Sequence, residues 1–236
     1  MVKDKILIIN PNTSKEMTED IKDTVEDVCA KDVDVEVIHP QKGPESIECK
    51  YDETIAGYEM IELLKSRKEK YSGVLIACFG DPCLYAIKEM MDCPVIGIAE
   101  ASITTALLLG NKFSILAAGK RAIPLMENMV RGYGLGERMA SIESLEMTVT
   151  DVEKQKDEAI RRLVRATKNA MEKGAEICIL GCAGMTSLKE KVESITGAVI
   201  LDPVEVGYCT LEMLCKNKIS MAKCNNFAFP PKKKFR

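Results

Sequence analysis

Two cysteines stand in matching surroundings in this sequence. Cys78 lies in the segment 77–82, Ala-Cys-Phe-Gly-Asp-Pro, and Cys182 lies in the segment 181–185, Gly-Cys-Ala-Gly-Met. Each follows a short apolar run that is typical of a buried strand, and glycine next to each frees the local backbone. Two such thiols predict proton transfer at a carbon atom. Inversion of a stereocentre requires one group to remove a proton from one face and another to supply a proton to the opposite face.

The residues around the two cysteines suggest how the reaction is supported. Glycine and then proline follow Cys78, so we expect a helix to begin there, with its dipole lowering the thiol pKa below about 8.5. Backbone N–H groups at 79–80 and 183–184 are expected to stabilise an enolate. Few charged side chains occupy these turns. The substrate is therefore predicted to be neutral and planar with amide groups, such as a cyclic imide or ureide.

Short apolar runs alternate with helical patterns along the whole chain. This alternation predicts an α/β fold with parallel sheets. Helix starts are predicted near Thr13 with Glu16, near Asp52 and at Asp81 followed by Pro82. The predicted strands are Ile6–Ile9, Val33–Ile38, Gly73–Ala77, Val95–Ile98, Phe113–Ala117, Ile177–Leu180 and Val199–Leu201.

The pattern also repeats. The runs that begin at Ile6 and Phe113 are 107 residues apart, and the two cysteines are 104 residues apart. We therefore expect two similar α/β halves related by pseudo-twofold symmetry, with both thiols at carboxyl ends of central strands and the active site in the cleft between the halves. The first half is predicted to span residues 1–100 plus 203–236, and the second residues 101–202.

Composition restricts the partners of this 236-residue chain. The 33 basic and 36 acidic residues give a net charge of −3, so there is no broad positive field for nucleic acid and a small molecule is the expected partner. No apolar run approaches the roughly 18 residues of a membrane span, and the chain runs directly into a strand pattern, so we expect a cytoplasmic protein with no membrane partner. Its ten cysteines are then expected to be reduced thiols. A homo-oligomer is expected on general grounds.

Other chemistries receive less support from the sequence. His39 is the only histidine, so a Ser-His-Asp arrangement has no other base, and no glycine-rich nucleotide motif is present. Four thiols, including Cys83 and Cys178, suggest a zinc or redox module. However, Cys178 and Cys182 in one extended segment would be about 13 Å apart, too far to share one zinc ion. We therefore predict no metal.

Five sequence blocks, in order, resemble the hydantoin racemase branch of the aspartate/glutamate racemase superfamily. They are Asn10-Pro11-Asn12-Thr13, Gly43 to Glu48, Ala77 to Pro82, Pro94 to Ala101 and Gly181 to Met185. The resemblance runs over nearly the whole chain. It implies the two-half α/β fold, an acid/base pair formed by Cys78 and Cys182, no cofactor, and substrates that are 5-substituted hydantoins, with allantoin racemases as a close relative. It also implies that the pocket is bordered by Asn10, Pro11, Asn12, Ile47, Phe79, Gly80, Ala183 and Gly184.

The chain departs from that family pattern at two places. Many relatives have glycine at the position of Cys83, and a pair of threonines at Ala117-Ala118. Loss of those hydroxyls leaves the exact substrate open. Because Cys83 is five residues from Cys78, oxidation is hypothesised to join the two in a disulfide, which reductant-independent activity of aged protein would contradict.

Three other functions fit the same fold. Amino-acid racemases of the superfamily usually have polar residues after their cysteines, where this chain has Phe79 and Ala183. A maleate-type cis–trans isomerase also uses paired cysteines, and a non-catalytic binding protein would keep the cleft. Lys120 and Arg121 follow a predicted strand and either reach the cleft or are solvated. Methionines at helical spacing are predicted to fill the core, at Met17, Met60, Met90, Met91, Met126 and Met129.

Overall fold

The structure is a computed structural model that describes residues 3–233. Its strands are β1 (Asp4–Ile9), β2 (Val33–Ile38), β3 (Gly73–Ile76), β4 (Val95–Gly97), β5 (Phe113–Ala117), β6 (Met139–Ser144), β7 (Ile177–Leu180) and β8 (Val199–Leu201). Its α-helices are α1 (Lys15–Val28), α2 (Lys50–Ser66), α3 (Leu84–Met90), α4 (Ile98–Leu109), α5 (Ala122–Gly132), α6 (Val149–Lys154), α7 (Lys156–Glu172), α8 (Lys189–Thr196) and α9 (Pro203–Lys216). Short 3₁₀ helices are η1 (Gly136–Arg138), η2 (Ala183–Leu188) and η3 (Asn225–Phe227).

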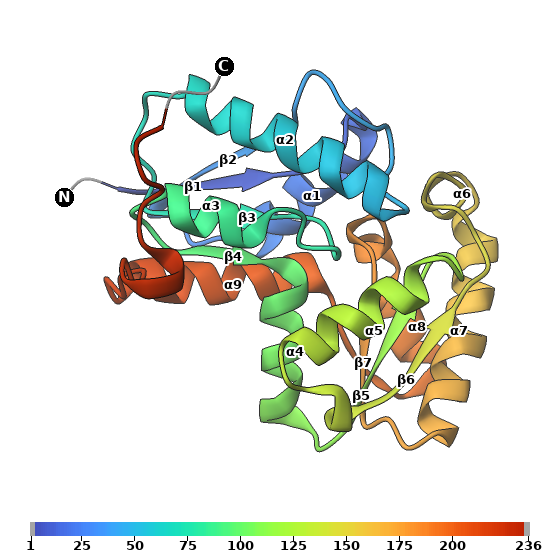
Figure 1. Cartoon of the computed structure of the whole chain (residues 1–236). Coiled ribbons are helices and arrows are strands. Elements are labelled where there is room, and N and C mark those ends of the chain that lie inside the picture. The colour runs from blue at the N-terminus through green and yellow to red at the C-terminus, as the bar shows by residue number, and fades with distance from the viewer. Residues whose placement is uncertain (1–2, 234–236) are drawn as a thin grey trace.

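The strands form two four-stranded parallel sheets with the same strand order. One sheet runs β2-β1-β3-β4 and the other β6-β5-β7-β8. Helices flank both sheets, and Figure 1 shows the two halves with α4 running from the first to the second. The predicted α/β fold of two similar halves is confirmed. The exact boundaries at residues 100 and 202 stay a prediction, and residues 234–236 of the first predicted half lie outside the described part of the chain.

Alternating side chains along the strands explain why each sheet is covered on both faces. In β1, Ile6 and Ile8 pack with α1 and α9, whereas Leu7 and Ile9 pack with α2 and α3. All four side chains are fully buried. Strands buried on both faces read as continuous apolar runs, which is why this strand was recognisable in the sequence.

The second sheet is built in the same way. Ile115 of β5 packs towards α4 and α5, and Leu116 packs towards α7 and α8. Its edge strand β6 escapes the sequence prediction because its residues, Met-Ala-Ser-Ile-Glu-Ser, are mixed and mostly only half-buried. The repeat contains the missing signal, since β6 begins 106 residues after β2.

Two helices join the halves. Helix α4 leaves the first sheet and leads into β5, while α9 follows β8 and packs back against α4 and β3. The approach is close at Gly207 of α9, where a Cβ atom would lie 3.0 Å from side-chain atoms of both Ile98 and Leu75. A larger residue at Gly207 would therefore separate the helices.

Two further findings bear on the sequence expectations. Among residues 3–233, no helix has the length and apolar character needed to cross a membrane. All ten cysteines are free thiols. The Cys83 sulfur packs against Gly57 of α2, where a Cβ atom would lie only 2.0 Å from it.

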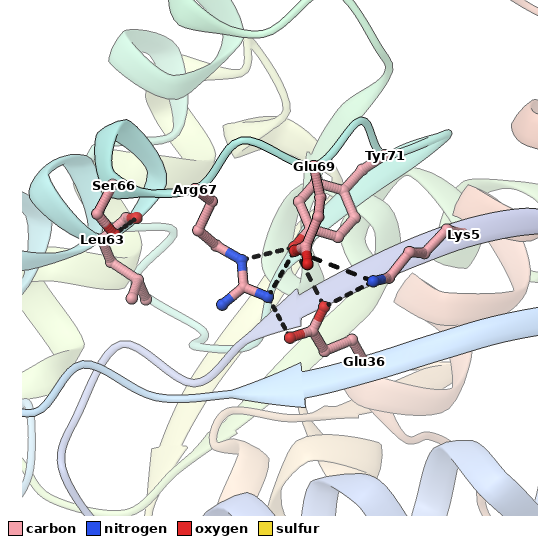
Figure 2. Close-up of polar contacts among 7 residues, drawn as sticks. All are labelled: Lys5, Glu36, Leu63, Ser66, Arg67, Glu69 and Tyr71. Carbon is pink, nitrogen blue, oxygen red and sulfur yellow. Dashed lines mark hydrogen bonds and ion pairs between the residues drawn. The ribbon is translucent and has the colours of Figure 1, made fainter.

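A polar network at the far end of the first sheet fixes α2 in place (Figure 2). Arg67 at the end of α2 donates through Nε to the Tyr71 hydroxyl (2.5 Å) and forms ion pairs with Glu36 of β2 and with Glu69. Lys5 of β1 lies 3.3 Å from Glu36. Burial opposes charge on Glu36, but hydrogen bonds from Arg67 and Lys5 outweigh it and lower the Glu36 pKa. The network links α2 to two strands.

We expect Arg67→Met to lower the free energy of unfolding by about 1 kcal/mol at pH 7, measured by urea denaturation. The Glu36 contribution exists while its carboxylate is ionised, so the difference from wild type should shrink as the pH falls below about 4. Lys22→Met, which removes only exposed pairs within α1, is the control and should cost less than about 0.5 kcal/mol. Equal losses in both variants would show that the network adds no stability.

Candidate active site

A cavity of about 100 Å³ lies between the two halves. Residues from both contribute to its wall, and both Cys78 and Cys182 are among them. Of the residues predicted to border the pocket, the structure places these at its wall: Asn12, Ile47, Phe79, Gly80 and Ala183. It does not place Asn10, Pro11 or Gly184 there.

The two cysteines occupy equivalent positions in the two sheets. Cys78 follows the end of β3 by two residues, and Cys182 follows the end of β7 by two residues. Both strands are interior strands of their sheets, and all strands are parallel, so the thiols lie at carboxyl ends. Ligands of open α/β sheets bind at this edge.

The helix predicted directly after Cys78 is absent. Helix α3 begins at Leu84, because Asp81 and Cys83 adopt left-handed backbone conformations with φ of 43° and 54°. The Asp81 carboxylate instead accepts hydrogen bonds from the backbone N–H groups of Ala99 (3.2 Å) and Glu100 (2.8 Å) in the first turn of α4. The turn that carries Cys78 is therefore attached to α4.

Asp81 also connects this turn to the second half. The Tyr133 hydroxyl, just after α5, donates to Asp81 (3.1 Å). Gly97 makes room for the carboxylate, since a Cβ atom there would lie 2.0 Å from Asp81 Oδ1. Burial raises the pKa of Asp81 to about 7, although all three donors favour the ionised form.

The turn after Cys182 has a corresponding attachment. Asp202 caps α9 by accepting from the N–H groups of Val204 (2.8 Å) and Glu205 (3.1 Å), and it also accepts from the Thr186 hydroxyl in η2. Thr24 of α1 lies 3.0 Å from the same hydroxyl. Both cysteine turns are thus tied to the helices that join the halves.

The thiol pKa values contradict the prediction of a stabilised thiolate. Burial raises the pKa of Cys182 from its usual value near 9 to about 11, and nearby acidic charges add to this effect. Burial also raises the pKa of Cys78, with the charge on Cys182 adding to it. Backbone N–H groups of Gly80 and Gly184 act in the opposite direction, because they hydrogen-bond to the two sulfurs. Gly184 therefore serves the thiol rather than the pocket wall.

The loop after β1 is held by Asn10, which is fully buried. Its amide nitrogen donates to Asn12 Oδ1 (2.8 Å), to the Ser14 carbonyl (3.2 Å) and to the Thr18 hydroxyl (3.0 Å). These bonds use the amide within the loop and leave Asn12 to face the pocket. Asn10 thus holds the loop together, and its predicted role in substrate binding stays a prediction.

Helix α5 forms an apolar wall of the pocket. This wall was not predicted from the sequence. Ala122, Leu125, Met126 and Met129 follow a helical i, i+3, i+4, i+7 spacing and all line the cavity. Met17 also lines it, so three of the six methionines predicted to fill the core border the pocket. The sequence signal for this wall was the helical spacing of apolar residues that follow the end of the predicted strand Phe113–Ala117.

Most charged side chains of the pocket are engaged. Lys50 forms an ion pair with Glu53, and the Glu48 carboxylate accepts from the Ser46 hydroxyl (3.2 Å) and the Val149 N–H (3.3 Å). Arg121 is exposed at the rim. Glu48, Lys50 and Glu53 give the first-half side of the pocket its polar character, and Arg121 belongs to the second-half side.

The remaining candidates lie outside the pocket wall. Lys120 forms an ion pair with Glu146 (2.8 Å), and His39 Nδ1 lies 2.9 Å from the Pro40 carbonyl oxygen. Within residues 3–233, no three His, Cys, Asp or Glu side chains are grouped so as to hold a metal ion.

Comparison with known proteins gives consistent matches over the chain. The family model described as Asp/Glu/Hydantoin racemase matches residues 6–209. A hydantoin racemase of Paenarthrobacter aurescens is 35% identical over 234 residues, covering 98% of this chain and 99% of the relative. The structure of an allantoin racemase from Klebsiella pneumoniae superposes with a TM-score of 0.92 at 31% identity, covering 99% and 96% of the two chains. For an allantoin racemase from Pseudomonas fluorescens the TM-score is 0.94 at 29% identity, covering 98% and 99%.

The raised thiol pKa values predict slow alkylation of both pocket cysteines. At pH 8, iodoacetamide should modify Cys182 at least about tenfold more slowly than the exposed Cys224, because burial raises the Cys182 pKa to about 11 and leaves little reactive thiolate. Site-resolved mass spectrometry of reduced protein measures both rates. Equal rates at the two cysteines would show that the Cys182 thiol is not desolvated as described.

Proposed function

The chain belongs to the Asp/Glu/hydantoin racemase family, and on that premise we propose that it inverts the stereocentre of a 5-substituted hydantoin without a cofactor. The carbon-bound proton moves by a two-base mechanism between Cys78 and Cys182. One observation carries this proposal: two thiols at equivalent turns of two similar sheets line the same cavity.

In this mechanism, one cysteine is a thiolate and the other a thiol when the substrate binds. The thiolate takes the proton from carbon 5, whose C–H electrons pass into an enolate, and the opposite thiol then donates its proton to the other face. The donor becomes the thiolate, so charge and protons balance. In the reverse direction the cysteines exchange roles.

The raised thiol pKa values suit this chemistry. A carbon-bound hydrogen beside a carbonyl is a weak acid, and a desolvated thiolate is a stronger base than a solvated one. The Gly80 and Gly184 N–H groups limit the cost of forming that thiolate. The Asn12 amide nitrogen donates a hydrogen bond to the Met17 sulfur alone (3.1 Å) among residues 3–233, which supports a role for Asn12 in binding a polar atom of the ring.

The apolar wall favours an apolar substituent at carbon 5. Ala118, Leu125 and Met129 offer no hydrogen-bonding side chain to a polar group in that part of the pocket. A ureido substituent such as that of allantoin would be desolvated there without partners. Allantoin is nevertheless the second candidate, because allantoin racemases superpose on the whole chain with TM-scores of 0.92 and 0.94.

Substrates with more charge fit the pocket less well. A free amino acid or maleate carries carboxylates that require cations at the site. Lys50 is paired with Glu53, so the exposed Arg121 at the rim is the cation that remains to bind a carboxylate.

The cytoplasmic location, the homo-oligomeric state and the domain boundaries at residues 100 and 202 stay predictions.

Either Cys78→Ala or Cys182→Ala should abolish racemisation of single hydantoin enantiomers, with at least about 1,000-fold loss of kcat/KM. Each variant keeps one base, so each should still exchange the carbon-5 proton of one enantiomer in heavy water, and the two variants should differ in which one. Optical rotation and NMR follow the two processes after subtraction of spontaneous racemisation. Full racemase activity in either variant would refute the two-cysteine mechanism, and an inactive wild type would favour a binding protein.

Leu125→Asn tests the substituent wall while it keeps the number and branching of the side-chain heavy atoms. Leu125 belongs to no buried core cluster, so its loss should act on substrate more than on folding. We expect kcat/KM for 5-benzylhydantoin to fall about tenfold and that for allantoin to fall less or to rise. Asn128→Ala, on the exposed side of α5, is the control. Equal losses for both substrates would place the substituent elsewhere.

A further inference from the structure

One carboxylate near the pocket has no role in the mechanism above. Glu153 lies on α6, and its Oε1 atom is buried without a hydrogen-bond partner in the described part of the chain. A buried carboxylate oxygen without a hydrogen-bond partner is destabilising, so such a group calls for an explanation.

Glu153 lies close to Cys182. A Cβ atom placed on Gly184 would be 3.6 Å from Glu153 Cγ and 3.7 Å from Cys182 Sγ, so both side chains border the same small space. Glycine at this position leaves that space open. The negative charge of Glu153 also contributes, after burial, to the raised pKa of Cys182.

On its other side, Glu153 lines a second cavity of about 350 Å³. This side cavity shares Met17 and Val149 with the substrate pocket, so the two are neighbours. Its rim includes the exposed Glu16 and Glu45, and its volume is enough for about ten water molecules. Glu153 thus lies between the Cys182 thiol and a water-accessible side cavity that is separate from the substrate pocket.

A second route from Cys182 to water, outside the substrate pocket, would speed the reset of the proposed two-base reaction, and the inference rests on that function. After each turnover, Cys182 has either lost its proton to the product or gained one from the substrate. It must return to its former state before the same enantiomer can react again. While substrate or product fills the pocket, exchange with water on that side is blocked.

We propose that Glu153 exchanges protons between Cys182 and water in the side cavity. To deprotonate Cys182, its S–H bond breaks and the proton forms an O–H bond on the Glu153 carboxylate, directly or through one water molecule. The protonated carboxyl then gives the proton to water in the side cavity and regains its charge. Protonation of the Cys182 thiolate follows the same steps in reverse.

The surroundings of Glu153 suit a proton carrier. Burial raises its pKa, and Asp20, Glu16 and Glu45 add to this rise while Lys154 opposes it. A raised carboxyl pKa lies nearer to that of Cys182 and reduces the energy needed for the transfer. Because Oε1 makes no other hydrogen bond, it is available to receive the proton.

The kinetic test uses Glu153→Gln, which keeps the shape of the side chain and removes its proton exchange. At low substrate concentration the thiols have time to reset, so kcat/KM should change less than about 2-fold, whereas kcat should fall about 5-fold or more. Added acetate should restore part of the lost kcat. Glu45→Gln removes a charge from the same cavity, and Glu45 makes the smallest of the acidic contributions to the Glu153 pKa, so this matched control should lose less than about 1.5-fold in kcat. Equal losses in kcat and kcat/KM without rescue, or no loss in kcat, would overturn the relay.

A second arm needs no turnover. Loss of the Glu153 charge should lower the Cys182 pKa, so Glu153→Gln should alkylate faster at Cys182 than wild type, while Glu45→Gln should not. An unchanged alkylation rate would overturn the inference even in an active enzyme. Wild-type protein that racemises no hydantoin would instead overturn the proposed function, and the two failures are therefore distinguishable. Thermal unfolding checks that both variants are folded at the assay temperature.

Discussion

The packing of α4 against α9 is the contact on which the site geometry depends. These helices join the two halves, and each has its N-terminus capped by a buried aspartate, Asp81 for α4 and Asp202 for α9. Asp81 belongs to the turn that carries Cys78, and Asp202 accepts from Thr186 in the turn that follows Cys182. The hydrogen bonds that cap the N-terminus of each helix therefore also position the thiol of the turn attached to it. A change in the helix packing would move the two thiols relative to each other.

The site is also shaped by what surrounds the thiols. Both are desolvated, and each receives one backbone N–H from the residue two positions later. A helix dipole or a nearby cation would lower the thiol pKa more, but it would also weaken the thiolate as a base towards carbon. The arrangement seen here keeps a strong base and stabilises it only locally. In the proposed mechanism such a base gains from a nearby acid or base that exchanges protons with solvent, which is the role we propose for Glu153.

Local patterns were enough to predict the sheets and the cysteine pair, because strands buried on both faces are continuous apolar runs and the repeat matched the two turns. Interactions between distant residues were out of reach. The partner of Asp81 lies 18 residues away at α4, so the sequence suggested a helix at Pro82 that does not form. Burial raises both thiol pKa values, and it depends on the packing of both halves. The amphipathic spacing of α5 was read as core because sequence does not distinguish a core face from a pocket face.

The twofold repeat is kept at the two cysteine turns, which the proposed mechanism uses for proton transfer, and is broken at the loops that border the pocket. The loop after β1 places polar Asn12 at the pocket, whereas the corresponding loop after β5 contributes Ala118. Ala117, beside it, is fully buried in the core, so of the two alanines at this departure Ala118 is the one that lines the pocket. This asymmetry is what a racemase requires. The ring and the substituent must stay in place on unlike walls, while the proton at carbon 5 is removed from one side and returned on the other by like groups.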